Sequence, residues 1–377
     1  MDDDAVQLPA HLTVRVGPTD DPVAAVVGLE AWESREKYPR LMMMPPVFGS
    51  LERVGPSAWR ILDFHSTTPQ MARDDLGHRF RCWARTEPGH PFAASWDITA
   101  EERAAYTAAY RRMDWEALDE IAVAGREYRI FRAEQVLRSG PEGIEPPRPT
   151  DPDPAEVGKG HRAPSRVRGF VIDPTAAVTL VDGILRLDMT ALVPAGHGIP
   201  EDVRADARLA SHLYPNVLVL PVHCAVAEYG KGRWAPMTAA CESPQAARDS
   251  LAAYLRDFAP RMLPRLTADE RARYAAAADR LDAERGHELS AGERRFRLVR
   301  VEPVVRLGPD GPELPRTSDW DPDLPVKLQE QRDREAGISY DDDHENDDGE
   351  SDGGGEDDGG GDGDGDDGGG AGALGGD

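Results

Sequence analysis

The strongest constraint on the fold of this chain is that its sequence repeats itself. Residues 97–154 align without a gap with residues 265–322 at an offset of 168 positions, and 27 of the 58 aligned residues are identical. In a composition this biased, chance would give roughly one identity in ten. Any fold must therefore accommodate the same unit twice.

The match continues upstream at an offset near 175, so the first copy has an insertion of about seven residues. Residues 68–74 then pair with residues 243–249, and the Tyr-Pro pair at Tyr38 finds its counterpart at Tyr214. Two copies of domain size do not make a solenoid, whose repeats are shorter and stack in threes or more. The sequence predicts a tandem pseudo-dimer.

Each copy is expected to contain a helix, two strands, two helices and a long strand, in that order. In the first copy these are a helix at 23–37, strands at 41–44 and around Trp59, helices after Thr68 and Thr99, and a strand at 126–138. In the second they are a helix at 201–213, strands at 217–220 and around Trp234, helices after Ser243 and Thr267, and a strand at 294–306.

The expected helix starts carry specific signals. Thr68 and Ser243 are N-cap residues that precede a proline, and Thr99 and Thr267 each open a capping box. Strands and helices do not alternate in a βαβ pattern, which favours an α+β fold over a doubly wound sheet.

The predicted organisation has four parts. These are a first α+β copy at 10–156, a linker with bridging β segments at 157–195, a second α+β copy at 196–325, and a charged segment with a disordered tail at 326–377. Within the linker, residues 167–173 and 177–190 are predicted to form strands.

Most of the acidity of the chain lies in its last 37 residues. Residues 341–377 hold 16 acidic residues, 15 glycines and no Lys or Arg, a composition typical of disordered polyanions. The rest has 44 basic and 53 acidic residues, a net charge of −9 instead of −25. An acidic body argues against a nucleic-acid binder.

Signals for membranes, metals and catalysis are missing. No apolar run approaches the ~18 residues of a membrane helix, and the acidic N-terminus is unlike a signal peptide. Cys82, Cys224 and Cys241 fit neither a disulfide framework nor a zinc-ligand spacing. His223 and Cys224 lie in a predicted buried strand, where cysteine is usually inert packing. The sequence thus predicts a cytoplasmic protein without metal or cofactor, and its catalytic residues are unknown.

Arginine and glutamate recur on one face of the long strand. Arg132 and Glu134, and likewise Arg300 and Glu302, are two residues apart and therefore point the same way. Such a pair can hold a ligand carboxylate or phosphate, with the glutamate orienting the guanidinium. It can equally form a structural ion pair on a sheet face.

A proline-rich segment follows each long strand and carries Arg148 in the first copy and Arg316 in the second. These segments are expected either to be surface straps tied to their own copy or to be equivalent docking loops. The predicted ligand-binding set is Arg132, Glu134, Arg300, Glu302, Arg148 and Arg316.

The phrase Arg-x-Gly-Pro-Glu/Asp-Gly-x-Glu-x-Pro-Arg-x-x-Asp occurs in both copies, and Tyr-Pro-Arg-Leu-Met-Met precedes it in the first. It resembles an uncharacterised actinobacterial (Streptomyces-type) family of unknown function over most of positions 10–325. The resemblance implies a cytoplasmic bacterial protein and a GC-rich genome, which suits 40 Arg against 4 Lys. It implies no activity, cofactor or catalytic residue.

These patterns favour a non-enzymatic ligand- or partner-binding protein that uses the pseudo-twofold interface, where two equivalent residue sets meet. The alternative is an enzyme that acts on a small anionic substrate through the paired Arg and Glu of the duplicated strand. The expected partner is a protein or a small anionic ligand, with no nucleic acid and no membrane. The sequence leaves the oligomeric state open.

Overall fold

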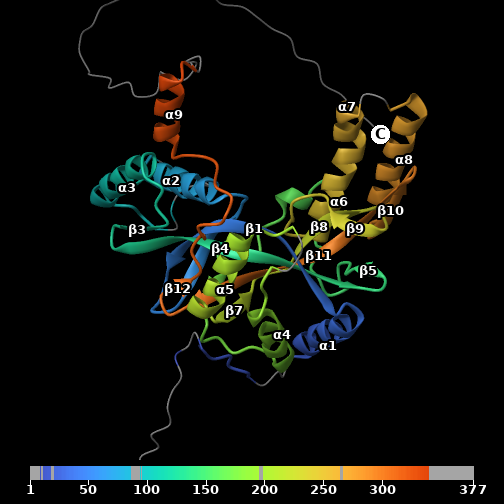
Figure 1. Cartoon of the computed structure of the whole chain (residues 1–377), viewed down its shortest axis with the longest axis horizontal. Helices are drawn as coiled ribbons and strands as arrows, with labels where there is room; N and C mark the ends of the chain where they lie inside the picture. The colour runs from blue at the N-terminus through green and yellow to red at the C-terminus, as the bar shows by residue number, and fades with distance from the viewer. Residues whose placement is uncertain are drawn as a thin grey trace, which may run out of the picture. The chain divides into compact units, whose positions relative to one another are not determined.

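The computed structural model of the chain describes Pro9 and residues 12–17, 21–85, 94, 96–194, 198–263 and 266–338. Contacts group the residues up to Arg332 into one compact unit and those from Asp333 onward into another. The first unit is a mixed α+β fold on a 12-stranded sheet whose named strands all pair antiparallel (Figure 1). The α+β prediction is confirmed at this level. The tail predicted to be disordered, 341–377, lies outside the described residues.

The first half of the unit, residues 21–156, begins with a helix and ends with a long strand. Its elements are α1 (Pro22–Lys37), β1 (Arg40–Arg53), β2 (Trp59–Ser66), α2 (Pro69–Arg85), α3 (Ala100–Met113), β3 (Glu120–Val123), β4 (Arg126–Gly140) and β5 (Gly143–Ile144).

A connecting segment, residues 157–195, leads to the second half, residues 196–325. The connecting segment contains η2 (Gly160–Arg162), β6 (Val171–Ile172) and α4 (Leu180–Thr190). The second half contains α5 (Glu201–Leu213), β7 (Asn216–Val219), β8 (His223–Gly230), β9 (Arg233–Pro236), α6 (Pro244–Ala253), the π-helical turn η3 (Tyr254–Phe258), α7 (Ala259–Met262), α8 (Ala268–Glu284), β10 (Glu288–Ala291), β11 (Arg294–Gly308) and β12 (Gly311–Pro312). Helix α9 (Val326–Glu335) follows.

The predicted helix starts are confirmed. The Thr68 hydroxyl accepts a hydrogen bond from the Met71 amide at 3.2 Å, and Ser243 opens α6 by the same contact. Both capping boxes form at Thr99 and Thr267. These short-range signals set the helix boundaries because they satisfy backbone amides that the helix itself leaves unpaired.

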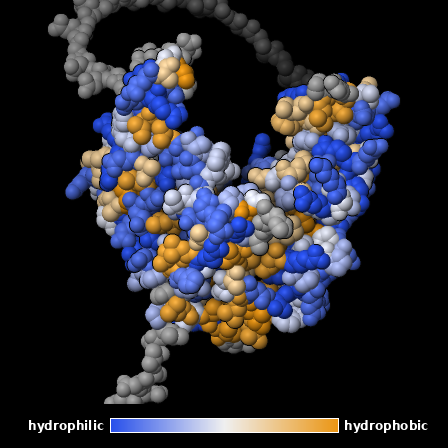
Figure 2. Space-filling view, viewed as in Figure 1, coloured by the Kyte–Doolittle hydropathy of each residue, from blue (hydrophilic) through white to orange (hydrophobic). Residues whose placement is uncertain are grey.

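The strand predicted for residues 177–190 is wrong, because most of this stretch forms helix α4. The Thr179 hydroxyl caps the helix by accepting from the Asp182 amide at 3.1 Å, and Leu185 and Met189 lie one turn apart on its buried side. Leu187, by contrast, stays exposed. Apolar residues gather on the surface where α4 lies in Figure 1 (Figure 2). No helix among the described residues is long and apolar enough to span a membrane.

The two long strands pair at the centre of the sheet, whose order is β6-β2-β1-β4-β11-β8-β9. Gln135 of β4 lies opposite Pro303 of β11, and these positions align at the offset of 168. The strands that flank this central pair are also paired in equivalent register in the two halves. β1 places Phe48 opposite Arg132, and β8 places Cys224 opposite Arg300.

Two helix pairs cover opposite ends of the sheet (Figure 1). Helices α2 and α3 pack on β4 through a cluster of large aromatic side chains, in which the Tyr106 and Tyr128 hydroxyls are 2.8 Å apart. Helices α6 and α8 pack on β11 around Phe296 with smaller apolar residues. Both helix pairs therefore bury the same alternate face of their long strand.

The segment that follows each long strand packs on the other half of the molecule. We call residues 141–153 the first arm and residues 309–321 the second arm. Arg297 donates to the Ile144 carbonyl of the first arm at 3.1 Å, and Arg129 donates to the Pro312 carbonyl of the second arm at 2.9 Å. The predicted strap tied to its own copy is therefore wrong, because the two arms are exchanged.

The arms also complete the helices of the opposite half. Asp321 accepts a hydrogen bond from the Gln70 amide at the start of α2 at 2.8 Å, and Asp153 accepts from the Gln245 amide at the start of α6 at 2.8 Å. Negative charge at a helix N-terminus is stabilising. Each half thus supplies part of the other half's helix cap.

We predict that the arms depend on their glycines. Gly143 and Gly311 have φ values of +108° and +118°, and an added Cβ would lie 2.7 Å from Trp234 Cδ1 and 2.6 Å from Trp59 Nε1 respectively. Gly143→Ala and Gly311→Ala should each lower the free energy of unfolding by at least ~2 kcal/mol, since backbone strain and a steric clash add. Urea unfolding measures the change.

Gly125→Ala is the matched control for this experiment. Gly125 has φ +74° and open space around it, so alanine there should cost only ~1 kcal/mol of backbone strain. Equal losses in all three variants would contradict a role of the glycines in docking the arms.

Candidate functional site

A cavity of about 630 Å³ lies where the two halves and the connecting segment meet. This volume is within the usual range for small-molecule sites. It is lined by Met44, Pro45, Pro46, Val47, Phe64, His65, Thr67, Gln135, Pro152, Pro154, Gly160, His161, Ala163, Pro164, Arg166, His223, Pro236, Met237, Thr238, Ala239, Ala240, Cys241, Glu242, Ser243, Ala246 and Pro303.

Residues at equivalent positions of the repeat in the two halves both line this cavity. Gln135 and Pro303 both line it from the central strand pair. Val47 and His223 do the same, and they hold the same register against β4 and β11, opposite Ala133 and Val301. The cavity therefore lies next to the segment over which β4 pairs with β11.

The backbone of the lining provides few hydrogen-bond donors. Seven of its residues are prolines, which have no amide N–H. One N–H of the Gln135 side-chain amide donates to the Pro45 carbonyl at 2.6 Å. The Thr238 and Ser243 hydroxyls accept from the backbone amides of Val226 and Ala246 at 3.0 Å and 3.1 Å, which leaves their O–H groups as donors.

His223 is the most deeply buried titratable group in this lining, with 5% of its surface exposed. Its Nδ1 lies 3.1 Å from the Pro221 carbonyl oxygen, which can only accept, so Nδ1 carries the hydrogen. Burial lowers the pKa of His223 and keeps the ring neutral. Its Nε2 has no hydrogen-bond partner among the described residues and is left as an acceptor.

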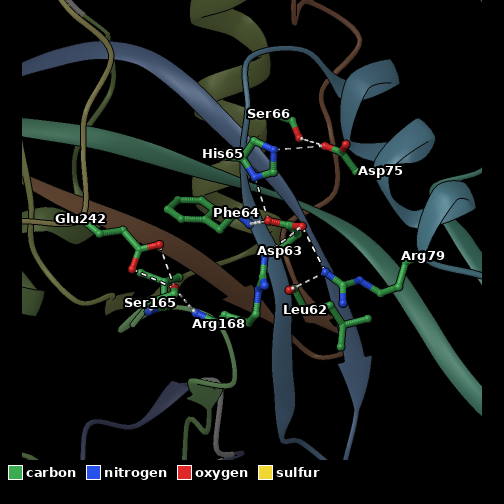
Figure 3. A network of polar contacts seen from close by, with 11 residues as sticks. Leu62, Asp63, Phe64, His65, Ser66, Asp75, Arg79, Ser165, Arg168 and Glu242 are labelled. Carbon is green, nitrogen blue, oxygen red and sulfur yellow. Dashed lines mark hydrogen bonds and ion pairs between the residues drawn. The ribbon is translucent and has the colours of Figure 1, made fainter. Parts of the chain in front are cut away.

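A second histidine at the cavity has the opposite environment (Figure 3). His65 Nδ1 lies 2.7 Å from Asp63 Oδ1, and His65 Nε2 lies 3.6 Å from Asp75 Oδ2. The hydrogen bond to Asp63 raises the pKa of His65. Burial acts to raise the pKa of Asp63, but the contacts with His65 and Arg79 outweigh it and lower that pKa.

The connecting segment is attached to both halves beside the cavity (Figure 3). The Ser165 hydroxyl donates to Glu242 of the second half at 2.8 Å, and the Arg166 amide donates to the same carboxylate at 2.7 Å. Arg168 lies 3.7 Å from Asp63 of the first half. Residues 165–168 therefore bridge the two halves at this site.

The two cysteines of the second half are free thiols next to the cavity. Cys241 lines it, and Cys224 lies behind Cys241, joined to it by two backbone hydrogen bonds of 2.7 Å. Burial raises the pKa of both thiols, so both stay protonated. A protonated thiol is a weak nucleophile.

The predicted ligand-binding residues form two buried networks that involve the exchanged arms. In the first network, Arg132 Nε bonds Asp319 of the second arm at 2.9 Å, and its Nη1 lies 2.6 Å from Glu134 Oε1. Arg316 Nη2 lies 3.0 Å from Glu134, and Arg316 Nε bonds Glu313 at 2.6 Å.

The second network has the same pattern with the halves interchanged. Arg300 Nε lies 3.0 Å from Asp151 of the first arm, and another of its nitrogens bonds Glu302. Arg148 bonds Glu145 at 2.6 Å and lies 3.7 Å from Glu302.

The six side chains are no more than 11% exposed, and each has an oppositely charged partner within the protein. Burial acts to raise the pKa values of Glu134 and Glu302, but the facing arginines lower them, so both stay ionised. Alternation along the strands turns this pair to the face opposite Gln135 and Pro303. The networks thus lie behind the cavity, and ligand contact with them stays a prediction.

The chain belongs to a family of unknown function, DUF5954, whose model matches residues 21–322. No curated protein and no solved structure matches it. Among the described residues, no three His, Cys, Asp or Glu side chains are grouped so that they could hold a metal ion.

We predict that the networks are structural. Arg132→Ala and Arg300→Ala should each lower the free energy of unfolding by about 3–5 kcal/mol, because two carboxylates would stay buried without their partner. Arg112→Ala is the control, since it removes an exposed pair with Glu116 and should change stability by less than ~0.5 kcal/mol. Similar unfolding midpoints for all three variants would refute this role.

The two histidines should titrate in opposite directions. In NMR titrations His65 should show a pKa above the ordinary ~6.5 and His223 a pKa below it. The stability contributed by His65 is present below pH ~6.5 and is lost as pH rises through its raised folded-state pKa. Burial keeps His223 neutral in the folded state, whereas the unfolded state takes up a proton below pH ~6.5. The contribution of His223 therefore lowers the stability of the folded state as pH falls below ~6.5. Asp63→Asn should bring only His65 back toward its ordinary pKa.

Proposed function

We propose that this protein is a non-enzymatic binding protein that takes up a small molecule in the cavity between its two halves. We further propose that the halves are a tandem duplication arranged as a pseudo-twofold pair. The observation that carries the proposal is that aligned positions of both halves line one mainly apolar cavity.

Sequence identity, strand pairing and the exchange of the arms support the duplication. The aligned segments share 27 of 58 residues, and the pairing of Gln135 with Pro303 joins aligned positions. The strand registers recur on both sides of this pair. The arms exchange reciprocally, and their hydrogen bonds to Arg297 and Arg129 and to the amides of Gln245 and Gln70 correspond.

The alternative is an enzyme that uses the paired Arg and Glu of the long strands on a small anionic substrate. Such an enzyme would need guanidinium groups that face an open site. Arg132 and Arg300 instead bond carboxylates of the arms and of their own strand. Binding in the cavity is therefore the better-supported function.

We also propose a cytoplasmic setting in an actinobacterium. The three free cysteines suit a reducing compartment, and the use of 40 Arg against 4 Lys suits a GC-rich genome. We propose separately that the chain binds a protein partner. The acidic segment 341–377 suits contact with a basic surface of such a partner.

The binding proposal is tested with N-phenyl-1-naphthylamine, a neutral dye whose fluorescence rises in apolar sites. The wild-type chain should bind one equivalent in a saturable manner. Ala163→Trp places a large side chain in the lining and should weaken binding at least ~tenfold, or ~1.4 kcal/mol.

Ala235→Trp is the control, because Ala235 is exposed on β9 and does not line the cavity. It should bind the dye as the wild type does. Absence of saturable binding, or binding that Ala163→Trp leaves unchanged, would overturn the proposal.

A further inference from the structure

We infer that the cavity selects a neutral, mainly apolar molecule with one hydrogen-bond donor, a hydroxyl or N–H group, which bonds to Nε2 of His223. This inference rests on the proposed function and adds the class of ligand. It follows from the chemistry of the lining.

The first argument is the unpaired acceptor. The His223 side chain lines the cavity and is 5% exposed, and its Nδ1 is fixed by the Pro221 carbonyl. Its Nε2 has no partner in the described part of the chain. The ring is held in one tautomer with Nε2 as an acceptor, so a donor that reaches Nε2 gains a hydrogen bond for which the site is already arranged.

The second argument is that the lining offers an anion no buried positive charge. His223 is neutral, one N–H of the Gln135 side-chain amide is engaged by the Pro45 carbonyl, and prolines contribute carbonyls but no N–H groups. The exposed Arg166 lies at the rim of the cavity beside Glu242, whose carboxylate already accepts a hydrogen bond from the Arg166 amide. A carboxylate ligand would lose its hydration and meet another carboxylate there.

The third argument concerns the apolar body of the ligand. Phe64 lines the cavity and stands edge-on to His223, with ring centroids 5.8 Å apart, and it stacks on Phe131 behind it at 5.3 Å. Met44 and Met237 also line the space, and methionine side chains adapt to ligands of different shape. An aromatic or alicyclic body suits this surface.

The test compares three probes of one shape by displacement of N-phenyl-1-naphthylamine. These probes are 2-naphthol, 2-methylnaphthalene and 2-naphthoate, used at pH 7.5, where His223 is neutral. One neutral hydrogen bond corresponds to about a 3- to 10-fold difference in affinity. The expected order is 2-naphthol first, 2-methylnaphthalene about 3- to 10-fold weaker, and 2-naphthoate weakest.

His223→Phe keeps an aromatic ring but removes Nε2, so 2-naphthol and 2-methylnaphthalene should then bind equally. His65→Phe is the matched control. His65 lines the same cavity, but its nitrogens face the carboxylates of Asp63 and Asp75. This control variant should keep the preference for 2-naphthol.

The outcomes separate the inference from the proposed function. If the dye binds but the two neutral probes compete equally in the wild type, or if 2-naphthoate competes best, the inference is wrong while the cavity remains a binding site. If neither the dye nor any probe binds, the proposed function itself fails. Should His223→Phe not fold, the ¹⁵N resonance of Nε2 in the wild type must shift with 2-naphthol and not with 2-methylnaphthalene.

Discussion

The reciprocal exchange of the two arms is the interaction on which the rest of this structure depends. Arg132 finds its carboxylate in Asp319, 187 residues away, and Arg300 finds its carboxylate in Asp151, 149 residues away. A buried guanidinium without a counter-charge is strongly unfavourable. The glutamate on the same strand gives each arginine one counter-charge, and the arm of the other half supplies the second, so burial of the long strands couples the two halves.

The exchange also determines where a site can exist. The charged networks hold β4 against β11 from one face of the strand pair, and Gln135 and Pro303 turn to the other face, where the cavity lies. The bridge from Glu242 through residues 165–168 to Asp63 adds a further connection between the halves. On the proposed function, a cavity framed by such connections is largely pre-formed, so little of the protein must become ordered when a ligand binds.

Local features of this fold could be predicted from the sequence, and long-range ones could not. The capping boxes and the N-caps at Thr68 and Ser243 depend on neighbours within a few positions, and both are present. The half on which each arm packs could not be predicted, because the repeated motif is the same in both copies and does not indicate which copy the arm contacts. The cavity carries no sequence signature either, since prolines and alanines from distant segments line it and His223 resembles ordinary packing.

The proposed duplication gives one physical reason for the residues that the two copies share and another for the positions at which they differ. The charged networks are built twice, so the same residues are needed twice, as in Arg132 and Arg300. The cavity at the centre is built once, and aligned positions such as Gln135 and Pro303 face it from two sides. The copies are then free to differ there, as Val47 and His223 do. Shared residues between the copies thus mark the frame, and on the proposed function the positions at which they diverged determine which ligand the cavity takes.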